Sequence, residues 1–315
     1  MKKQFSVAVV GATGLVGQTM LKVLHERNFP VSDVILYAFN SGEAHTPFGT
    51  KEVYELSGAN IYRRPCDFAL FAVSNEVSIK YAQIFSTMGA IVIDNSSAWR
   101  MDDNVPLVIP EVNPSSAFMH SGIIANPNCT TAQILTAMAP IHREFGIVRM
   151  IVSTYQSVSG AGAAALADLQ SGECNVFDLP IKNNLLPKID TYHSDGYTGE
   201  ELKIVNETHK ILSSRIKVNA TSVRVPITNC HGATVNFKLT RTANLSEISE
   251  CLMQAPSVKL LDIPTPLDAV GQDNVLVGRL RRDESEENSF CLWTVADNLR
   301  KGAATNAVQI AELLI

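Results

Sequence analysis

The pattern of apolar and polar positions differs between the two halves of the chain. In the first half, short apolar runs rich in β-branched residues alternate with segments whose apolar residues recur every three or four positions. The runs are FSVAVV, DVILYAFNSGE, FALFAV, AIVIDN, LVIPEVNP and GIIANPN, and a helical pattern covers residues 76–87. This order predicts β/α units that build a doubly wound parallel sheet.

In the second half, from about residue 148, the pattern of apolar and polar residues changes. VRMIVSTYQSVSGAG alternates like a half-buried strand and ends in a glycine-serine loop, and SVRVPITNCHGATVNFKLT predicts another long strand pair. An antiparallel-rich α+β domain is therefore expected. The chain closes on VADNLRKGAATNAVQIAELLI, a predicted helix whose apolar positions suit packing on the first domain.

Length supports two domains, since 315 residues exceed one comfortable core. The fold class expected is α/β. It combines a doubly wound, Rossmann-type N-terminal domain over residues 1–130, joined by the C-terminal helix 297–315, with an α+β domain over residues 131–296.

Composition narrows the class of protein. The chain has 26 basic and 31 acidic residues and a net charge of −5, with no basic run, so a nucleic-acid partner is not expected. No apolar run reaches the roughly 18 residues that span a membrane, and the N-terminal residues lack a signal-peptide pattern. Six cysteines without CxxC pairs or metal-ligand spacing predict reduced thiols, a cytoplasmic location and no metal site.

The first strand ends in a glycine turn that predicts dinucleotide binding. Gly11, Gly14 and Gly17 follow the apolar run at three-residue spacing, and a helical pattern begins at Leu15. Glycines at such a turn let the backbone approach a pyrophosphate, which lies on the N-terminus of the helix. The spacing is GxxGxxG rather than GxGxxG, a variation found in several NADP enzymes.

The end of the second strand bears on the choice of cofactor. NAD sites usually carry an acid there that accepts the ribose 2′-hydroxyl. Here the sequence reads Phe39, Asn40, Ser41, Gly42, with Glu43 following. Asn40 and Ser41 suit hydrogen bonds to a 2′-phosphate, which favours NADP. Ordinary turn chemistry is the alternative explanation for these two residues.

Cys129 lies where a loop gives way to a helix, in IIANPNCTTAQILTAM. Unpaired backbone amides and the positive end of the helix dipole favour a thiolate at such a position. A small apolar core residue is the alternative. Cys129, like Ser74, Asn95 and Ser96, follows a predicted strand, at the edge where such sheets bind ligands.

A thiolate beside a nicotinamide site suggests oxidation or reduction of an aldehyde through a thioester. Such chemistry requires a proton acceptor, an oxyanion donor and cations for an anionic substrate. Residues of suitable type are Gln156, His231, Arg224, Lys203 and Arg100. Their spacing in the sequence does not show that they converge.

Several motifs, in the same order along nearly the whole chain, closely resemble the aspartate-semialdehyde dehydrogenase family. They are VVGATGLVG, VIDNSSAWRMDDNVPLVIPEVNP, NPNCTT, TYQSVSGAG, VRVP with a histidine seven residues after its arginine, and VADNLRKGAATNAVQIAELL. The resemblance implies NADPH-dependent, reversible reduction of aspartyl phosphate to aspartate semialdehyde with release of inorganic phosphate. It implies a homodimer, with catalysis and dimerisation in residues 131–296, and a place in lysine, threonine, methionine and diaminopimelate biosynthesis.

The resemblance also implies roles for individual residues. Cys129 would form the acyl-thioester, Gln156 would orient the substrate and His231 would be the acid/base. The substrate-binding residues implied are Arg224 for the carboxylate, Glu200 for the amine, Arg100 and Lys203 for the phosphate, and Asn128. The cofactor-binding residues implied are Gly11, Thr13, Gly14, Leu15, Val16, Asn40, Ser41, Ser74, Ser159, Gly160 and Asn298.

Two departures from the family pattern leave alternatives open. Asn40 replaces an arginine that commonly grips the 2′-phosphate, and Cys230 replaces a glycine before the histidine, where a side chain crowds the loop or costs backbone freedom. A reductase of the N-acetylglutamyl-phosphate type is one alternative, although NPNCTT, Glu200 and Arg224 favour a short amino-acid substrate. A weakly active or non-catalytic paralogue is the other.

Overall fold

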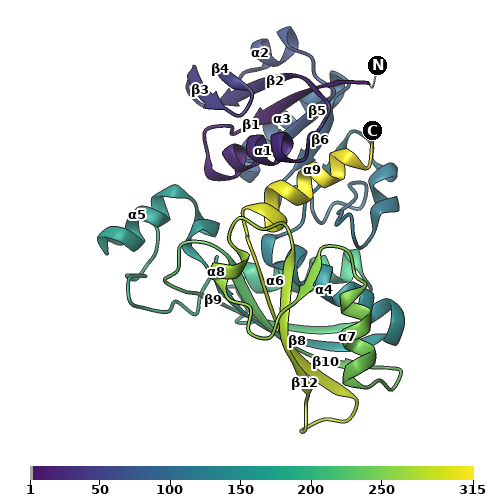
Figure 1. Cartoon of the computed structure of the whole chain (residues 1–315). Helices are drawn as coiled ribbons and strands as arrows, with labels where there is room; N and C mark the ends of the chain where they lie inside the picture. The colour runs from purple at the N-terminus through teal and green to yellow at the C-terminus, as the bar shows by residue number, and fades with distance from the viewer. Residues whose placement is uncertain (1–2) are drawn as a thin grey trace. The chain divides into compact units, whose positions relative to one another are not determined.

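The computed structural model describes residues 3–315, which form two compact units. The first unit comprises the described residues up to Pro127 together with Ala303–Ile315, and the second comprises Asn128–Gly302. Each unit contains one sheet with its helices (Figure 1). Among these residues, no helix combines the length and apolar character needed to cross a membrane.

The first unit is built on a seven-stranded sheet in the order β3-β4-β2-β1-β5-β6-β7. Its strands are β1 (Phe5–Val10), β2 (Val31–Ala38), β3 (Gly42–Thr46), β4 (Gly49–Glu55), β5 (Phe68–Phe71), β6 (Ile91–Asp94) and β7 (Ile123–Ala125). All neighbours are parallel except β3 and β4, which form an antiparallel hairpin at one edge. The Rossmann-type prediction is confirmed, whereas the edge hairpin was not predicted.

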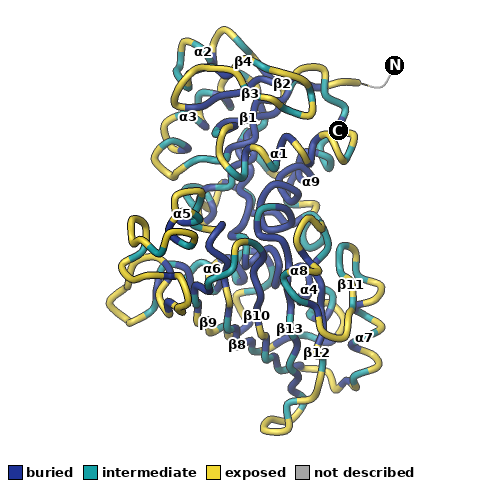
Figure 2. Tube along the Cα trace, turned by 60° about the vertical axis from the view of Figure 1, so that its left-hand side comes forward, coloured by how far each residue is buried: buried dark blue, intermediate teal, exposed yellow. Residues whose placement is uncertain are grey.

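The helices of this unit follow the predicted β/α order. They are α1 (Leu15–Glu26), α2 (Gly58–Arg63), α3 (Asn75–Thr87), the short 3₁₀ helix η1 (Pro114–Met119) and α9 (Thr305–Glu312). Buried residues of α9, such as Ala307 and Val308, share one core with Val7 and Leu24, and most of α9 is dark in Figure 2. The last helix therefore packs on the first domain, as its apolar pattern predicted.

Two predicted elements of this unit are wrong. LVIPEVNP forms no strand, because its two prolines donate no amide hydrogen, and only Leu107 makes a bridge to Ala125. The expected helix over 297–315 begins at Thr305, after a π-helical turn at Arg300–Ala304. The Gly302 amide donates to the Asp297 carbonyl five residues earlier, so the first turn of this segment is π-helical rather than α-helical.

The second unit is built on a six-stranded mixed sheet in the order β11-β12-β13-β10-β8-β9. Its strands are β8 (Ile147–Gln156), β9 (Lys217–Arg224), β10 (His231–Leu239), β11 (Val258–Leu260), β12 (Val275–Arg282) and β13 (Ser289–Ala296). Its helices are α4 (Cys129–Phe145), η2 (Val158–Ala161), α5 (Ala163–Ser171), α6 (Gly199–Ile211), α7 (Leu245–Met253) and α8 (Pro266–Ala269).

The predicted strand pair β9 and β10 is not paired directly, because β8 lies between them. β8 is parallel to β9 and antiparallel to β10. The crossover through α5 and α6 makes β9 run parallel to β8, and parallel neighbours require such a connection. Since β8 lies between β10 and β9, its last residue has neighbours on both sides.

Candidate active site

Cys129 is the first residue of α4, as the sequence predicted. The preceding Asn128 caps the helix: its side-chain oxygen accepts the amides of Thr130 at 2.9 Å and Thr131 at 3.2 Å. The thiol therefore belongs to the first residue of α4, at the positive end of the helix dipole. This position favours the nucleophilic thiolate. Cys129 is half-buried rather than sealed in the core.

The strand register brings together three residues that the sequence could not place. Gln156, at the end of β8, is paired with Arg224 on β9 and with His231 on β10. Arg224 Nη1 donates to the Ser157 carbonyl at 2.8 Å, which holds the guanidinium beside the end of β8. One end of the sheet thus presents an amide, a guanidinium and an imidazole side by side.

Helix α6 joins this edge to the turn before Cys129. Glu200 Oε1 accepts Asn128 Nδ2 at 2.9 Å and Gln156 Nε2 at 3.0 Å. Lys203 Nζ lies 3.4 Å from Glu200 Oε2 and 2.7 Å from Asp190 Oδ2. The predicted residues Asn128, Gln156, Glu200 and Lys203 therefore form one hydrogen-bonded chain.

His231 is fully buried and is held in one tautomer. Its Nδ1 accepts the backbone amide of Ser157 at 3.0 Å, so the proton of the neutral ring lies on Nε2. Burial, and next the positive charge of Arg224, lower the pKa of His231 to about 3, although a backbone hydrogen bond involving Cys230 opposes this. Among residues 3–315, His231 Nε2 has no hydrogen-bond partner, which leaves its N–H for a substrate atom.

Arg224 is a buried cation with unused hydrogen-bonding capacity. It is 5% exposed, and its Nε has no partner among the described residues. Burial lowers the pKa of Arg224, while the charges of Glu200 and Cys129 act in the opposite direction. These two groups are therefore close enough to Arg224 to influence it. A planar guanidinium of this kind suits a substrate carboxylate.

Asn298, expected at the cofactor, organises the loop after β8. Its Oδ1 accepts the hydroxyls of Ser157 and Ser159, each at 3.2 Å, and the amide of Cys230 at 2.9 Å. Gly160 lies in the same loop, where a β-carbon would be 3.1 Å from Arg224 Nη1 and 3.2 Å from His231 Nε2. Of the expected cofactor residues, Gly160 thus lies against the imidazole, whereas Ser159 and Asn298 are linked to it through Ser157.

Cys230 costs backbone freedom rather than crowding the site. Its φ is +71°, a left-handed conformation in which glycine is favoured. Its thiol lies in an apolar cluster with Ala269, Leu276 and Val295, and burial raises its pKa to about 12. The thiol therefore stays protonated and does not compete with Cys129 as a nucleophile.

Gly302, which the sequence did not indicate, lies directly against the nucleophile. A β-carbon at Gly302 would be 2.7 Å from the β-carbon of Cys129 and 3.1 Å from its α-carbon. Both positions belong to the second unit. No side chain fits there without moving the start of α4, so glycine is required by close packing.

Replacing Gly302 by alanine is expected to destabilise the protein by about 1–3 kcal/mol, because the added methyl overpacks against Cys129. Urea unfolding measures the loss. Gly42→Ala is the matched control, since a β-carbon at Gly42 meets nothing within 4 Å and its φ is not positive. Equal stability of the two variants would contradict the packing argument.

The glycine turn of the first unit forms an anion-binding helix N-terminus. Gly11, at φ +84°, makes the turn, and α1 begins after Gly14. No side chain caps α1, and its first turn carries no acidic residue. The amides near Thr13, Leu15 and Val16 are therefore not occupied by a side-chain cap, so this loop fits the pyrophosphate of a dinucleotide.

Other expected cofactor residues lie at the carboxyl edge of the same sheet. Asn40 and Ser41 follow β2 and are exposed, and Ser74 is the N-cap residue of α3, after β5. Because β2 and β5 both flank β1 in parallel, these residues and the glycine turn lie on one edge. Glu43 is the second residue of β3 and so does not directly follow β2.

Arg100, expected at the phosphate, is held rigidly in the first unit. Its Nε donates to the Asn126 carbonyl at 2.9 Å and its Nη2 to the Asn95 carbonyl at 2.7 Å. The side chain is only 8% exposed. Two carbonyls at the ends of β6 and β7 thus fix a guanidinium that suits an oxyanion.

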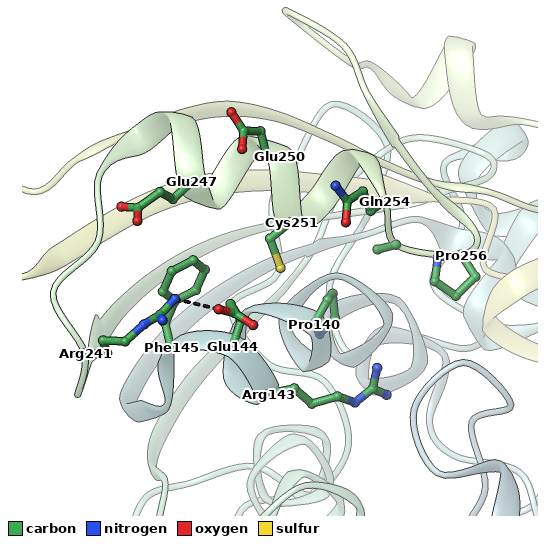
Figure 3. A pocket seen from close by; sticks show the side chains of 11 residues that line it. Pro140, Arg143, Glu144, Phe145, Arg241, Glu247, Glu250, Cys251, Gln254 and Pro256 are labelled. Atoms are coloured by element: carbon green, nitrogen blue, oxygen red, sulfur yellow. Dashed lines mark hydrogen bonds and ion pairs between the residues drawn. The ribbon is translucent and has the colours of Figure 1, made fainter.

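A surface cavity of about 430 Å³ lies in the second unit, near the end of α4 remote from Cys129 (Figure 3). It is lined by the last turns of α4, by α7 and by Arg241, whose guanidinium pairs with Glu144 at 2.6 Å. Pro140, in its wall, is eleven residues from Cys129 along α4, or roughly 16 Å. Among residues 3–315, no cluster of histidine, cysteine or carboxylate groups suits a metal ion.

Family models cover most of the chain. Residues 6–119 match the model described as "Semialdehyde dehydrogenase, NAD binding domain", and residues 138–301 match "Semialdehyde dehydrogenase, dimerisation domain". The chain therefore belongs to the class of semialdehyde dehydrogenases.

Known relatives narrow this class. The aspartate-semialdehyde dehydrogenase of Aquifex aeolicus is 47% identical, with 99% of this chain and 98% of the relative covered. That of Bacillus subtilis is 42% identical over 100% of this chain and 98% of the relative. A crystal structure of aspartate semialdehyde dehydrogenase II from Vibrio cholerae, complexed with ASA, matches with a TM-score of 0.95 and 42% identity, covering 99% of this chain and 98% of that chain.

The chain therefore belongs to the aspartate-semialdehyde dehydrogenase family, and the resemblance found in its motifs is confirmed.

Proposed function

We propose that this protein catalyses the NADPH-dependent reduction of aspartyl phosphate to aspartate semialdehyde and phosphate, and the reverse reaction. The observation that carries the proposal is the position of Cys129 at the start of α4. It directly follows Asn128, which is hydrogen-bonded to Glu200, and Glu200 also holds Gln156 between Arg224 and His231. The relatives at 42–47% identity bear the name of this activity. A homodimer, assembled through the second domain, is part of the proposal and is supported by the dimerisation-domain match.

Each side chain has a defined task in this reaction. The Cys129 thiolate attacks the acyl carbon of aspartyl phosphate, a sulfur–carbon bond forms, and the carbon–oxygen bond to phosphate breaks. A nicotinamide held by the dinucleotide-binding residues would supply the hydride needed to reduce the resulting thioester. His231, expected as the acid/base, serves as the acid in this direction: its Nε2–H donates a hydrogen bond to the carbonyl oxygen as negative charge develops there. When the aldehyde leaves, Cys129 recovers its electron pair, and the proton consumed overall ends on the released phosphate.

The remaining residues bind and orient the substrate. Arg224 pairs with the α-carboxylate, and Glu200 with the ammonium group. Gln156, fixed by its hydrogen bond to Glu200, orients the acyl group. Lys203 and Arg100 bind the phosphate, and Asn128 holds Glu200. The pairing of a buried cation with a buried carboxylate on neighbouring elements suits a short amino acid that carries both charges.

We assign the dinucleotide to the glycine turn, at Gly11, Thr13, Gly14, Leu15 and Val16. The other cofactor contacts assigned are Asn40, Ser41, Ser74, Ser159, Gly160 and Asn298. NADP is preferred over NAD in this proposal, because no acid follows β2 directly to repel a 2′-phosphate. Asn40 and Ser41 are exposed and so are accessible to that group.

The proposal is tested with purified protein, aspartate semialdehyde and either NADP or NAD, with and without inorganic phosphate. Phosphate-dependent formation of NADPH is expected. N-acetylglutamate semialdehyde should react about a hundredfold less efficiently, because its acetylated nitrogen cannot pair with Glu200. Preference for that aldehyde would favour the other reductase, and folded protein without turnover would indicate a non-catalytic paralogue.

Substituting Asn40 by arginine is expected to lower the KM for NADP about tenfold, because a guanidinium forms charge-assisted hydrogen bonds with the 2′-phosphate. The KM for NAD should stay within about twofold. Steady-state kinetics with both cofactors measures the shift, and Asn40→Asp is the opposite control, expected to favour NAD. A similar effect of arginine on both cofactors would contradict this placement of the 2′-phosphate.

A further inference from the structure

Two carboxyl groups on one face of α6 hold the residue before the nucleophile. Glu200 and Glu207 are seven residues apart, about two helical turns, and so face the same side. Glu200 accepts the Asn128 side chain, whereas Glu207 Oε2 accepts the backbone amide of Asn128 at 2.7 Å. Both carboxyl groups are buried, and Glu207 is 1% exposed. Asn128 is therefore fixed by side chain and backbone at once.

The contact with Glu207 replaces half of a capping box. In α6 and α7 the third helical residue, Glu201 or Glu247, accepts the amide of the N-cap residue of its own helix. In α4 that position is Thr131, whose buried hydroxyl oxygen has no partner among the described residues. Glu207 supplies the missing acceptor from another helix.

Glu207 accepts the backbone donor that lies closest before Cys129. Pro127 carries no amide hydrogen, so the Asn128 amide is the donor nearest to the nucleophile on that side. Loss of its acceptor would leave a buried N–H unpaired, which costs free energy and favours movement of the turn. Because the Asn128 side chain also caps α4, such movement would change the amide groups around Cys129.

We propose that Glu207 is a positioning residue for the nucleophile: its carboxyl group completes the N-terminal cap of α4 across two helices and so fixes Asn128 and the thiol of Cys129. The proposal rests on Cys129 being the nucleophile of the proposed function. Glu207 contacts the backbone rather than the substrate, and its effect passes through Asn128.

The test compares Glu207→Gln, which keeps an oxygen acceptor, with Glu207→Met, which has a similar length and none. Each variant is treated with iodoacetamide at pH 7, and mass spectrometry follows alkylation at Cys129. Exposed Cys174 is an internal reference in every sample. Glu201→Met is the control variant: it removes a buried carboxyl group from the same helix, one that accepts Thr198 and Ser222 amides.

Alkylation of Cys129 is expected to slow about tenfold or more in Glu207→Met, relative to Cys174 and to the wild type, and to stay within about threefold in Glu207→Gln. With aspartate semialdehyde, kcat should fall about ten- to a hundredfold in Glu207→Met, with KM changed less than about threefold. Glu201→Met should lower the melting temperature but leave Cys129 alkylation unchanged.

Wild-type alkylation of Cys129 in Glu207→Met would overturn the inference, and so would equal losses in the glutamine and methionine variants. An equally slow Cys129 in Glu201→Met would also overturn it, since any damage to α6 would then suffice. Alkylation needs neither substrate nor cofactor. A wild-type protein without turnover on aspartate semialdehyde would therefore reject the proposed function and leave this comparison intact.

Discussion

Serine in place of Cys129 is expected to lower kcat for aspartate semialdehyde by about four orders of magnitude or more. The start of α4 favours a thiolate at this position, whereas a serine hydroxyl stays protonated at neutral pH and has no base to activate it. His231 does not supply that base, because its one free nitrogen, Nε2, already carries the proton. The measurement is phosphate-dependent NADPH formation at saturating substrate.

Two controls define this result. Cys174→Ser removes an exposed thiol of the second unit and should leave kcat within about twofold. Cys129→Ser should unfold at nearly the wild-type urea concentration, since the hydroxyl takes the place of a half-buried thiol at a helix start. Turnover within tenfold of the wild type in Cys129→Ser would exclude the thioester mechanism.

Local sequence patterns predicted two parts of the site, the glycine turn before α1 and the start of α4, because each lies within one short segment of the chain. The run into Gly11 predicted β1, the turn and α1, because strand, glycine and helix are adjacent in sequence. IIANPNCTTAQILTAM predicted a helix start at Cys129, and in the structure Asn128 caps this helix through the amides of Thr130 and Thr131. Both signals are short-range, and both elements begin where expected.

The convergence of the substrate-binding residues depends on long-range pairing. Nothing in the sequence states that β8 separates β9 from β10, yet this order makes Gln156 the neighbour of both Arg224 and His231. In the sequence, nothing distinguishes Glu207 from the other acidic residues of a helix, or Gly302 from the other 17 of the 18 glycines. Their roles arise from packing against Asn128 and Cys129, which only the fold reveals.

The wrong predictions also have physical causes. The apolar pattern of the last segment is helical, but its first turn closes with an i+5 hydrogen bond from the Gly302 amide to the Asp297 carbonyl, so the α-helix begins only at Thr305. The apolar residues of LVIPEVNP are largely buried as expected, but its prolines prevent strand pairing. In both segments the apolar pattern correctly predicted which residues are buried. The conformation of the backbone was determined by its hydrogen bonding, which the pattern does not show.

His231 is expected to remain neutral, with its proton on Nε2, throughout the working pH range. The Ser157 amide points at Nδ1, so protonation there would oppose two N–H groups, and Arg224 adds a positive charge nearby. Nitrogen-15 NMR of histidine-labelled Cys129→Ser protein should show this tautomer from about pH 5 to 8. A His231 ring doubly protonated at pH 6.5 would contradict the assignment.

The free energy of unfolding should fall at low pH, because the folded protein keeps His231 neutral. The pKa of His231 is about 3 in the folded protein and 6.5 for an ordinary histidine, so between these values the unfolded chain binds a proton that the folded protein does not. Stability contributed by the neutral ring is therefore present above about pH 6.5 and is lost as the pH falls toward 3. Urea unfolding at pH 7.5 and 5 measures this loss.

His231→Gln should lack this pH-dependent component and should lower kcat by about two to three orders of magnitude, since no imidazole N–H remains to meet the carbonyl oxygen. His209→Gln is the matched control. This histidine lies on α6, in the same unit, but it is not paired with Gln156 as His231 is. An unchanged pH dependence of unfolding in His231→Gln would show that another group is responsible. A wild-type kcat in that variant would remove the imidazole from the mechanism.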